Sequence, residues 1–412
     1  MNRLLRLTCA ALALILLTAC VASEPVLPQI TQPAVIDEEL PEEGQPVPAD
    51  DPVPAAEPDP EPVPEPEPEP ITIRITAAGD NLLHNTLSID SEQPDGTFDF
   101  YHLYEQVAPL IEGSDIAFIN QEVMLTGEVS AYPNLAAPAE AADALIKAGF
   151  NVINLATNHS LDKGVKGLEA CLENVHQRDF EAVLGAFRSE EEASELCILE
   201  KKGIRFGFLS YTYGLNGYSL PKDKSYMIAL IDEVKIAEDM AAIRPLCDYL
   251  IVSMHWGNEY QLTASSYQVD LAQMLCDYGA DLIIGTHPHV LEPVEWYDSE
   301  EGNRTLCVYS LGNFVSGQHK LPTMLGGILD LRLTFDPETH QLLSTDSAGI
   351  IPTVTHYRSK GGYCVYPLQD YTAELAAEHG IKNFDKPMTL DYLNDLAEQV
   401  LGEFAMKWEP EK

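Results

Sequence analysis

From Ile71 onward, short apolar runs alternate with amphipathic segments, and this alternation restricts the fold classes that the chain can adopt. Residues 71–76 and 249–254 have the apolar pattern of strands, whereas 139–147 and 165–175 have the composition or spacing of helices. The remaining predicted elements are strands over 152–156, 201–213 and 282–284, helices over 237–246 and 269–278, and two closing helices after Thr372. The sequence therefore predicts an α/β fold with a largely parallel or mixed sheet.

The segment 21–70 has a different composition from the rest of the chain. It holds 15 of the 29 Pro and 14 acidic residues but no Lys or Arg. Such a segment cannot bury a core, so we expect a disordered, extended Pro/Glu-rich linker, partly polyproline II. At ~3.1 Å per residue it could reach on the order of 100 Å. A protein-binding motif is the alternative interpretation.

Residues 1–20 have the pattern of a lipoprotein signal peptide. Arg3 and Arg6 precede the apolar run 7–17, which is too short to span a membrane as an ordinary helix. The run ends in the sequence LTAC, which resembles the bacterial lipobox with Cys20 as the lipidated residue. We therefore expect a lipid-anchored protein on the extracytoplasmic face of a bacterial cell membrane. A plain cleaved signal with an incidental Cys is the alternative.

The formal net charge of −41 argues against a nucleic-acid partner, because phosphate contacts need clustered Lys and Arg. The predicted domain, 71–412, still holds 51 acidic and 22 basic residues. Such a domain would repel an anionic substrate, so a bound divalent metal, with Lys222 or Lys224, would have to supply the local positive charge. Both lysines lie in a predicted loop, 216–224, where solvated charge is the simpler interpretation.

Six cysteines follow Cys20, and none has the CxxC spacing of a metal site. They are Cys171, Cys197, Cys247, Cys276, Cys307 and Cys364. Because most of them lie in apolar runs, buried free thiols are the expected state, although export would permit a disulfide.

Polar residues of the kinds that bind metals follow one predicted strand after another. They are Asp80, Asn120, Glu122, Asn158, His159, His255, His287, His289 and Asn313. The carboxyl ends of strands line the ligand crevice of open α/β sheets, so these side chains are expected to meet. A single such residue is more often part of a turn, but a series of this length predicts a site.

The chemistry of the series points to divalent metal ions. Imidazoles, carboxylates and a carboxamide suit Zn, Mn or Fe, and the thiolates of a structural zinc site are missing from it. His287 and His289 are two residues apart, and in an extended segment they would point to the same side. The set exceeds the needs of one ion, so we expect two ions ~3.5–4 Å apart.

These residues stand in motifs that resemble, in order, those of CapA-type capsule or poly-γ-glutamate biosynthesis proteins. The motifs are Gly79-Asp80, Asn120-Gln121-Glu122, Ala156-Thr157-Asn158-His159-Ser160-Leu161-Asp162, Met254-His255-Trp256-Gly257, Gly285-Thr286-His287-Pro288-His289 and Tyr309-Ser310-Leu311-Gly312-Asn313-Phe314. The resemblance runs from Ile71 to at least Gly327. It implies the calcineurin-like metallophosphoesterase superfamily and its four-layer α-β-β-α sandwich.

The resemblance also implies roles for individual residues. The implied metal ligands are Asp80, Glu122 (where the superfamily usually has Asp), Asn158, His255, His287 and His289. His159 would be the catalytic acid, with metal-activated hydroxide as nucleophile. Asp162 would orient His159 or cap the helix that follows. Asn120 and Asn313 would contact substrate, although Asn313 could instead hold a turn.

Two departures from the superfamily pattern bear on activity. The His expected two residues after Asp80 is Leu82, which His84 could replace, and the acid expected after His159 is Ser160. A lost ligand would weaken one metal site or change its metal. Trp256 and Tyr260 could stack on a substrate or pack beneath the site. The other histidines are expected to be structural or exposed: His102, His176, His319, His340, His356 and His379.

The resemblance implies a surface lipoprotein that takes part in assembling capsule or poly-γ-glutamate polymer. Its partners would be the anionic polymer or a phosphoester substrate, the membrane through the lipid, and membrane synthase or export subunits. Three activities remain open: a metal-dependent hydrolase, a non-catalytic metal-binding subunit of an export or anchoring complex, and a general surface phosphoesterase.

Overall fold

The computed structural model describes residues 68–409. The strands are β1 (Ile71–Leu82), β2 (Ile116–Gln121), β3 (Val152–Asn154), β4 (Ala182–Leu184), β5 (Cys197–Lys201), β6 (Ile204–Thr212), β7 (Tyr249–His255), β8 (Leu282–Thr286), β9 (Val294–Asp298), β10 (Arg304–Val308), β11 (Asn313–Ser316), β12 (Leu325–Phe335), β13 (Leu342–Arg358) and β14 (Gly361–Pro367). The α-helices are α1 (Asn85–Ser91), α2 (Ala108–Ile111), α3 (Glu140–Lys147), α4 (Gly164–His176), α5 (Glu233–Ile243), α6 (Ser266–Asp277), α7 (Ala373–Glu378) and α8 (Leu390–Leu401). The 3₁₀ helices are η1 (Tyr101–Leu103), η2 (Glu192–Ser194), η3 (Lys222–Met227), η4 (Arg244–Leu246), η5 (Leu321–Met324), η6 (Leu368–Asp370), η7 (Gly380–Asn383) and η8 (Gly402–Phe404).

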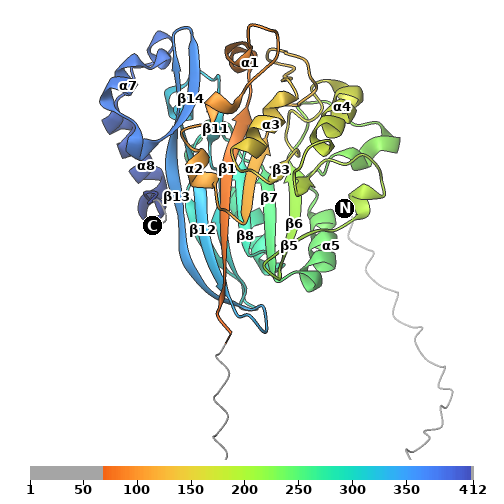
Figure 1. The fold of residues 1–412 in the computed structure, drawn as a ribbon. Coiled ribbons are helices and arrows are strands. Elements are labelled where there is room, and N and C mark those ends of the chain that lie inside the picture. Colours follow the sequence, from red (N-terminus) through yellow and green to blue (C-terminus); the bar gives the residue numbers. More distant parts are fainter. Residues whose placement is uncertain (1–67, 410–412) are drawn as a thin grey trace, which may run out of the picture. The chain divides into compact units, whose positions relative to one another are not determined.

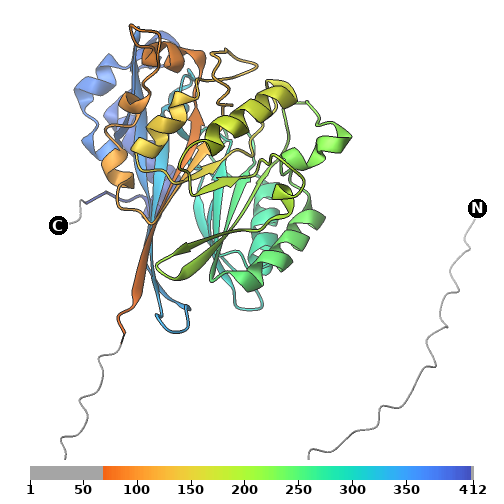
Figure 2. The same cartoon turned by 45° about the vertical axis from the view of Figure 1, so that its right-hand side comes forward.

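The strands form two sheets that face each other (Figures 1 and 2). One has eight strands in the order β14-β13-β12-β1-β2-β3-β4, with β11 pairing beside β1, and the other has the order β5-β6-β7-β8-β10-β9. The ring of Phe335 on β12 contacts the rings of Phe206 on β6 and Tyr249 on β7, at centroid distances of 6.1 and 6.2 Å. Apolar side chains from both sheets therefore make one shared core.

Helices cover the outer faces of the two sheets. On the six-stranded sheet, alternate residues such as Val252 and Ile283 pack with Met240 of α5 and Leu275 of α6 in a separate apolar cluster. Helices α3 and α4 connect the parallel strands β2, β3 and β4, and α7 and α8 lie beside β13 (Figure 1). The predicted four-layer α-β-β-α sandwich is confirmed.

Parallel pairing brings the carboxyl ends of strands from both sheets to one edge. Strands β1, β2 and β3 are parallel, and so are β6, β7 and β8. β1 changes partner at Gly79, where an added Cβ would lie 2.0 Å from the carbonyl oxygen of Gly312. Only glycine allows this approach, which pairs Asp80 with Asn313 and joins two of the predicted site residues.

Several predicted elements are found within a few residues of their expected positions, including α3, α4, α6 and the two closing helices. Helix α5 begins earlier than predicted, at Glu233, because the Asp232 side chain caps it by accepting from the N–H groups of Val234 and Lys235. The antiparallel strands β12, β13 and β14 were not among the predicted elements. They complete the eight-stranded sheet next to β1.

The predicted signal peptide (1–20) with Cys20, and all but three residues of the predicted linker (21–70), lie outside the described residues. Within 68–409, no helix combines the length and apolar character needed to cross a membrane. All six cysteines that follow Cys20 are described, and all are free. Four are buried as expected, whereas Cys197 and Cys364 are half-buried.

Candidate metal centre

Glu122, at the end of β2, stands at the centre of the site. Its side chain is buried, and neither carboxylate oxygen has a hydrogen-bond partner among the described residues. Oε1 lies 3.9 Å from Nε2 of His159, 3.9 Å from Nε2 of His255 and 3.8 Å from Nε2 of His289. These distances are too long for hydrogen bonds. An ion bound at ~2.0–2.2 Å to two such atoms would separate them by up to about 4.2 Å, so the carboxylate fits a metal site.

Two groups of three residues have the spacing needed to hold an ion. One is Glu122, His255 and His287, and the other is Asp80, Glu122 and His289. Within each group the ligand atoms lie within 4.8 Å of one another, and all five residues are buried. Glu122 belongs to both groups and would be shared between them if two ions were bound; the number of ions stays a prediction.

Asp80 is held in place by its neighbours. Its Oδ1 accepts a hydrogen bond from Nδ2 of Asn120 at 2.8 Å, and its Oδ2 lies 3.0 Å from Nδ1 of His289. The backbone N–H of His287 also donates to this carboxylate, at 3.2 Å. Contacts of this kind orient ligands and keep Nε2 of His289 free to face Glu122.

The two asparagines predicted to contact substrate lie behind the metal ligands. Asn120 is buried and donates to Asp80, while its own Oδ1 accepts from Asn154. Asn313 is buried with its Oδ1 3.1 Å from Nδ1 of His289. Both positions suit side chains that orient ligands, and a substrate contact of either stays a prediction.

Asn158 reaches the first metal group through its amide oxygen, which lies 3.0 Å from Nε2 of His255. Its Nδ2 donates to Oδ1 of Asn216 at 3.1 Å. Nδ1 of His255 is 2.9 Å from the hydroxyl of Thr286. Because Nδ1 contacts Thr286, Nε2 of His255 is the nitrogen positioned to bind an ion together with the Asn158 amide oxygen.

His159 forms a pair with Asp162, the partner predicted for it. Nδ1 of His159 lies 2.7 Å from Oδ2 of Asp162, which also accepts from the backbone N–H of Leu135. Helix α4 has Lys163 at its N-cap and no side-chain capping bond. Of the two roles considered for Asp162, the geometry thus favours orienting His159, whose other nitrogen faces Glu122. Its role in catalysis stays a prediction.

The two departures in the motifs have clear positions. Leu82 is buried in the apolar core, where a His ligand was expected. His84 belongs to neither metal group, and its Nδ1 accepts a hydrogen bond from the backbone N–H of Gly317. The structure does not support His84 as a replacement ligand. Ser160 donates to the carbonyl oxygens of Leu155 and Thr157 and stabilises the turn.

The prediction that His287 and His289 lie in an extended segment and point to the same side is wrong. Strand β8 ends at Thr286, and His287 and His289 have left-handed φ angles of 100° and 61°, so the segment is not extended. The ring centroids lie 5.7 Å apart, and each imidazole belongs to a different metal group. Strained backbone of this kind clusters at functional sites.

Burial and the clustered charges shift the pKa values of the side chains in the site. Burial and the nearby Asp80 raise the pKa of Glu122 well above its usual range. Burial and the neighbouring imidazoles lower the pKa values of His255 and His287. Burial opposes protonation of His289, but the Glu122 and Asp80 carboxylates outweigh it and raise the pKa to about 9. A divalent ion would relieve the repulsion between the two carboxylates.

Some residues at the site had no distinguishing sequence signal. The ring of Tyr213 lies 4.6 Å from that of His287, and Asn216 contacts Asn158 from the same loop. Tyr213 was expected to end the strand 201–213 but directly follows β6, and Asn216 lies in the predicted loop 216–224, whose sequence does not single it out. Trp256 packs beneath the site, where its Nε1 donates to the carbonyl oxygen of Tyr309. Lys224 pairs with Glu169, so it is not free to bind substrate.

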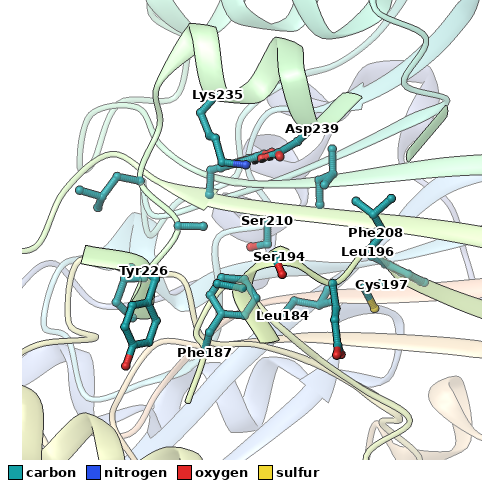
Figure 3. A pocket seen from close by; sticks show the side chains of 18 of the residues that line it. Leu184, Phe187, Ser194, Leu196, Cys197, Phe208, Ser210, Tyr226, Lys235 and Asp239 are labelled. Atoms are coloured by element: carbon teal, nitrogen blue, oxygen red, sulfur yellow. Dashed lines mark hydrogen bonds and ion pairs between the residues drawn. The ribbon is translucent and has the colours of Figure 1, made fainter. Parts of the chain in front are cut away.

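A cavity of about 610 Å³ lies next to the centre, between β4, β6 and α5 (Figure 3). Apolar side chains such as Leu184, Phe187 and Phe208 line it, and none of the predicted ligands does. Ser210 in its wall donates to Oδ1 of Asn154, whose Nδ2 donates in turn to Asn120. The cavity is therefore distinct from the metal centre but joined to it by hydrogen bonds.

Comparison with known proteins identifies the family. The model of the bacterial capsule synthesis protein PGA_cap matches residues 74–318, more than half of the chain. The chain belongs to this family. The matched segment contains every residue of both metal groups as well as His159 and Asp162.

Individual capsule synthesis proteins and solved structures are also similar. The PGA biosynthesis protein CapA of Bacillus subtilis (strain 168) is 30% identical over 230 residues, which cover 52% of this chain and 57% of the relative. The capsule biosynthesis protein CapA of Bacillus anthracis is 30% identical over 228 residues, covering 53% and 54%. The chain thus spans little more than half the length of these relatives. A phosphatase structure from Mycoplasma pneumoniae is 14% identical with a TM-score of 0.43, covering 69% of this chain and 95% of that one.

Proposed function

We propose that this protein is a surface-anchored, metal-dependent hydrolase that acts in the assembly of capsule or poly-γ-glutamate polymer. The observation that carries the proposal is the buried Glu122 carboxylate, shared by two ligand groups and facing the His159–Asp162 pair. The names of the relatives, which concern PGA and capsule biosynthesis, support a role with polymer.

The residues of the chain divide the work of such a reaction. Asp80, Glu122, Asn158, His255, His287 and His289 would hold two divalent ions, with Zn, Mn or Fe as candidates. When bound, these ions would lower the pKa of a coordinated water and so supply the nucleophile. Asp162 fixes the ring of His159 through Nδ1, so that Nε2 can hold a proton at the leaving group.

The lipid anchor and the location belong to the same proposal. Lipidation at Cys20 would hold the protein on the extracytoplasmic face of the membrane. The Pro/Glu-rich linker would then hold the domain away from the membrane surface. Such an arrangement would put the metal centre where it could meet exported polymer, or the membrane subunits that make or export it.

A non-catalytic metal-binding subunit is the second candidate, and two observations favour it. The side chains of the centre are 0–6% exposed, which leaves little room for a substrate at the ions. The buried Leu82 stands in place of a ligand that the superfamily usually has. A general surface phosphoesterase is a third possibility, which the polymer-related names of the relatives disfavour.

Hydrolysis assays on the purified full-length protein separate these functions. The protein, loaded with Zn²⁺, Mn²⁺ or Fe²⁺, is tested on a phosphodiester and on poly-γ-glutamate, and polymer is quantified in a strain that carries His159→Gln. The proposal expects turnover that His159→Gln removes while metal remains bound, together with altered polymer. Tight metal binding without turnover and with normal polymer in the mutant strain would refute the hydrolase. Phosphodiester turnover with normal polymer would favour the general phosphoesterase.

A further inference from the structure

Lys320 is an exposed cation at the edge of the metal centre. It precedes η5, and its Nζ lies 3.2 Å from the centroid of the Tyr260 ring. A cation over an aromatic face is held by the electrostatic field of the ring. No carboxylate partner of Lys320 is found among residues 68–409, whereas Lys224 and Lys235 both pair with acids. Lys320 therefore has an ammonium group that remains free to bind an anion.

Tyr260 lies next to a metal ligand and is fixed by its backbone. Its ring centroid is 6.0 Å from that of His289, and its N–H donates to the carbonyl oxygen of Pro288 at 2.8 Å. The φ angle of Tyr260 is 65°, a left-handed conformation that is unfavourable for an aromatic residue. Such conformations persist where the surrounding structure enforces them, commonly at ligand sites.

Hydrogen bonds connect Tyr260 to the metal centre by a second route. Nδ2 of Asn313 donates to Oε1 of Gln318 at 3.0 Å, and Nε2 of Gln318 donates to the Tyr260 hydroxyl at 3.4 Å. Oδ1 of Asn313 contacts Nδ1 of His289. The ring beneath Lys320 is thus part of the network that orients a metal ligand, so the ammonium group has a fixed place relative to the ions.

We propose that Lys320, held over Tyr260, forms an anion subsite that binds a carboxylate of a polyanionic chain while another part of that chain lies at the metal centre. The inference rests on the proposed function and adds a binding residue for its polymer outside the metal centre. The Lys320 ammonium group and the ions at the metal centre would be two separate positive positions, which suit a ligand with repeated anionic groups better than a simple monoester. The exposed ring of Tyr213, 4.6 Å from that of His287, offers apolar surface beside the centre to the methylene groups between the charges.

Glu259 opposes binding at this subsite. It is exposed and precedes Tyr260. Burial, and after it the Glu259 carboxylate, raises the pKa of the Tyr260 hydroxyl, which shows that the charge lies close to the ring. Its charge would reject a lone anion more strongly than a polymer that also reaches the ions. The subsite therefore gains selectivity for long polyanions, and removal of the Glu259 charge should strengthen binding.

Binding of a fluorescent poly-γ-glutamate decamer to full-length, metal-loaded protein tests the subsite by fluorescence anisotropy. Lys320→Glu should weaken the affinity about tenfold or more, because it sets a negative charge against the ligand. Glu259→Gln should strengthen it several-fold. Lys407→Glu is the matched control, since Lys407 is exposed and forms no ion pair with an acid within residues 68–409. This variant should change the affinity less than twofold.

Equal affinities of Lys320→Glu and Lys407→Glu would overturn the subsite. Inorganic pyrophosphate is the competing probe: if it binds with a dependence on Lys320 and the decamer does not bind, the carboxylate assignment is wrong. None of these measurements needs turnover. A protein that binds the decamer through Lys320 but hydrolyses nothing would support the subsite and refute only the hydrolase proposal. A protein that binds no metal would refute the metal centre.

Discussion

Replacing Glu122 by Gln should remove both metal ions, whereas replacing His287 by Gln should remove one. Gln keeps the shape of the buried side chain but lacks the charge that both ligand groups share. His287 belongs to only one group, so the group of Asp80, Glu122 and His289 would persist in its absence. Bound metal per chain, measured by elemental analysis after gel filtration, should fall from two to none in the first variant and to one in the second.

The metal-induced rise in Tm should follow the number of ions that each variant binds. An ion present at 100 times its Kd stabilises the folded state by about 2.7 kcal/mol. Unfolding entropy of ~2.1 cal/mol/K per residue gives ~0.7 kcal/mol/K for the 342 residues from 68 to 409. Each ion should therefore raise the Tm by about 4 °C, and two ions by about 8 °C. We expect a metal-induced rise of about 8 °C in the wild type, about 4 °C in His287→Gln and none in Glu122→Gln.

Glu292→Gln provides a matched control, because Glu292 is also a buried carboxylate but belongs to neither metal group. This variant should keep both ions and the full metal-induced rise in Tm. Two ions retained by Glu122→Gln, or equal losses in Glu122→Gln and His287→Gln, would refute the shared carboxylate.

Three further predictions follow from the geometry and the pKa shifts. His159→Gln should lower kcat by about 10²–10⁴-fold at unchanged metal content, and Asp162→Asn should lower it less, as measured by turnover and elemental analysis. Metal affinity should rise from pH 7 to pH 9 with release of a proton, measured by calorimetry in buffers of different ionisation enthalpy, because the pKa of His289 is about 9 and binding requires the neutral ring. Burial raises the pKa of Glu292 from 4.5 to about 7, so the free energy of unfolding is highest below pH 4.5 and falls as the pH rises through 7. Urea unfolding over this range should show the wild type losing up to about 3 kcal/mol relative to Glu292→Gln.

The sequence pattern was sufficient to predict the α/β alternation and the polar residues at the strand ends, whereas the four layers were implied by the family resemblance. Apolar periodicity identifies buried strands, and a polar residue just after each strand must lie at the carboxyl edge of the sheet. Packing of the two sheets against each other then brings Glu122, after β2, within 3.9 Å of His255, at the end of β7. These predictions depend on local patterns, which the fold preserves.

Other features depend on tertiary contacts that carry no local pattern. His287 and His289 have left-handed backbone, and Asp80, far away in the sequence, accepts a hydrogen bond from the His287 N–H. Tyr213 and Asn216 reach the centre because β6 lies beside β7, and the loop sequence does not encode that position. His84 is a possible ligand by residue type and sequence position, but its Nδ1 accepts a hydrogen bond from the Gly317 N–H and it belongs to neither metal group.

Anomalous diffraction from crystals grown with Mn²⁺ tests the metal centre most directly. We expect two peaks ~3.5–4 Å apart, bridged by the Glu122 carboxylate, with His255 and His287 at one and Asp80 and His289 at the other. A single peak, peaks that Glu122 does not contact, or no peak at saturating metal would contradict a two-metal centre in this protein.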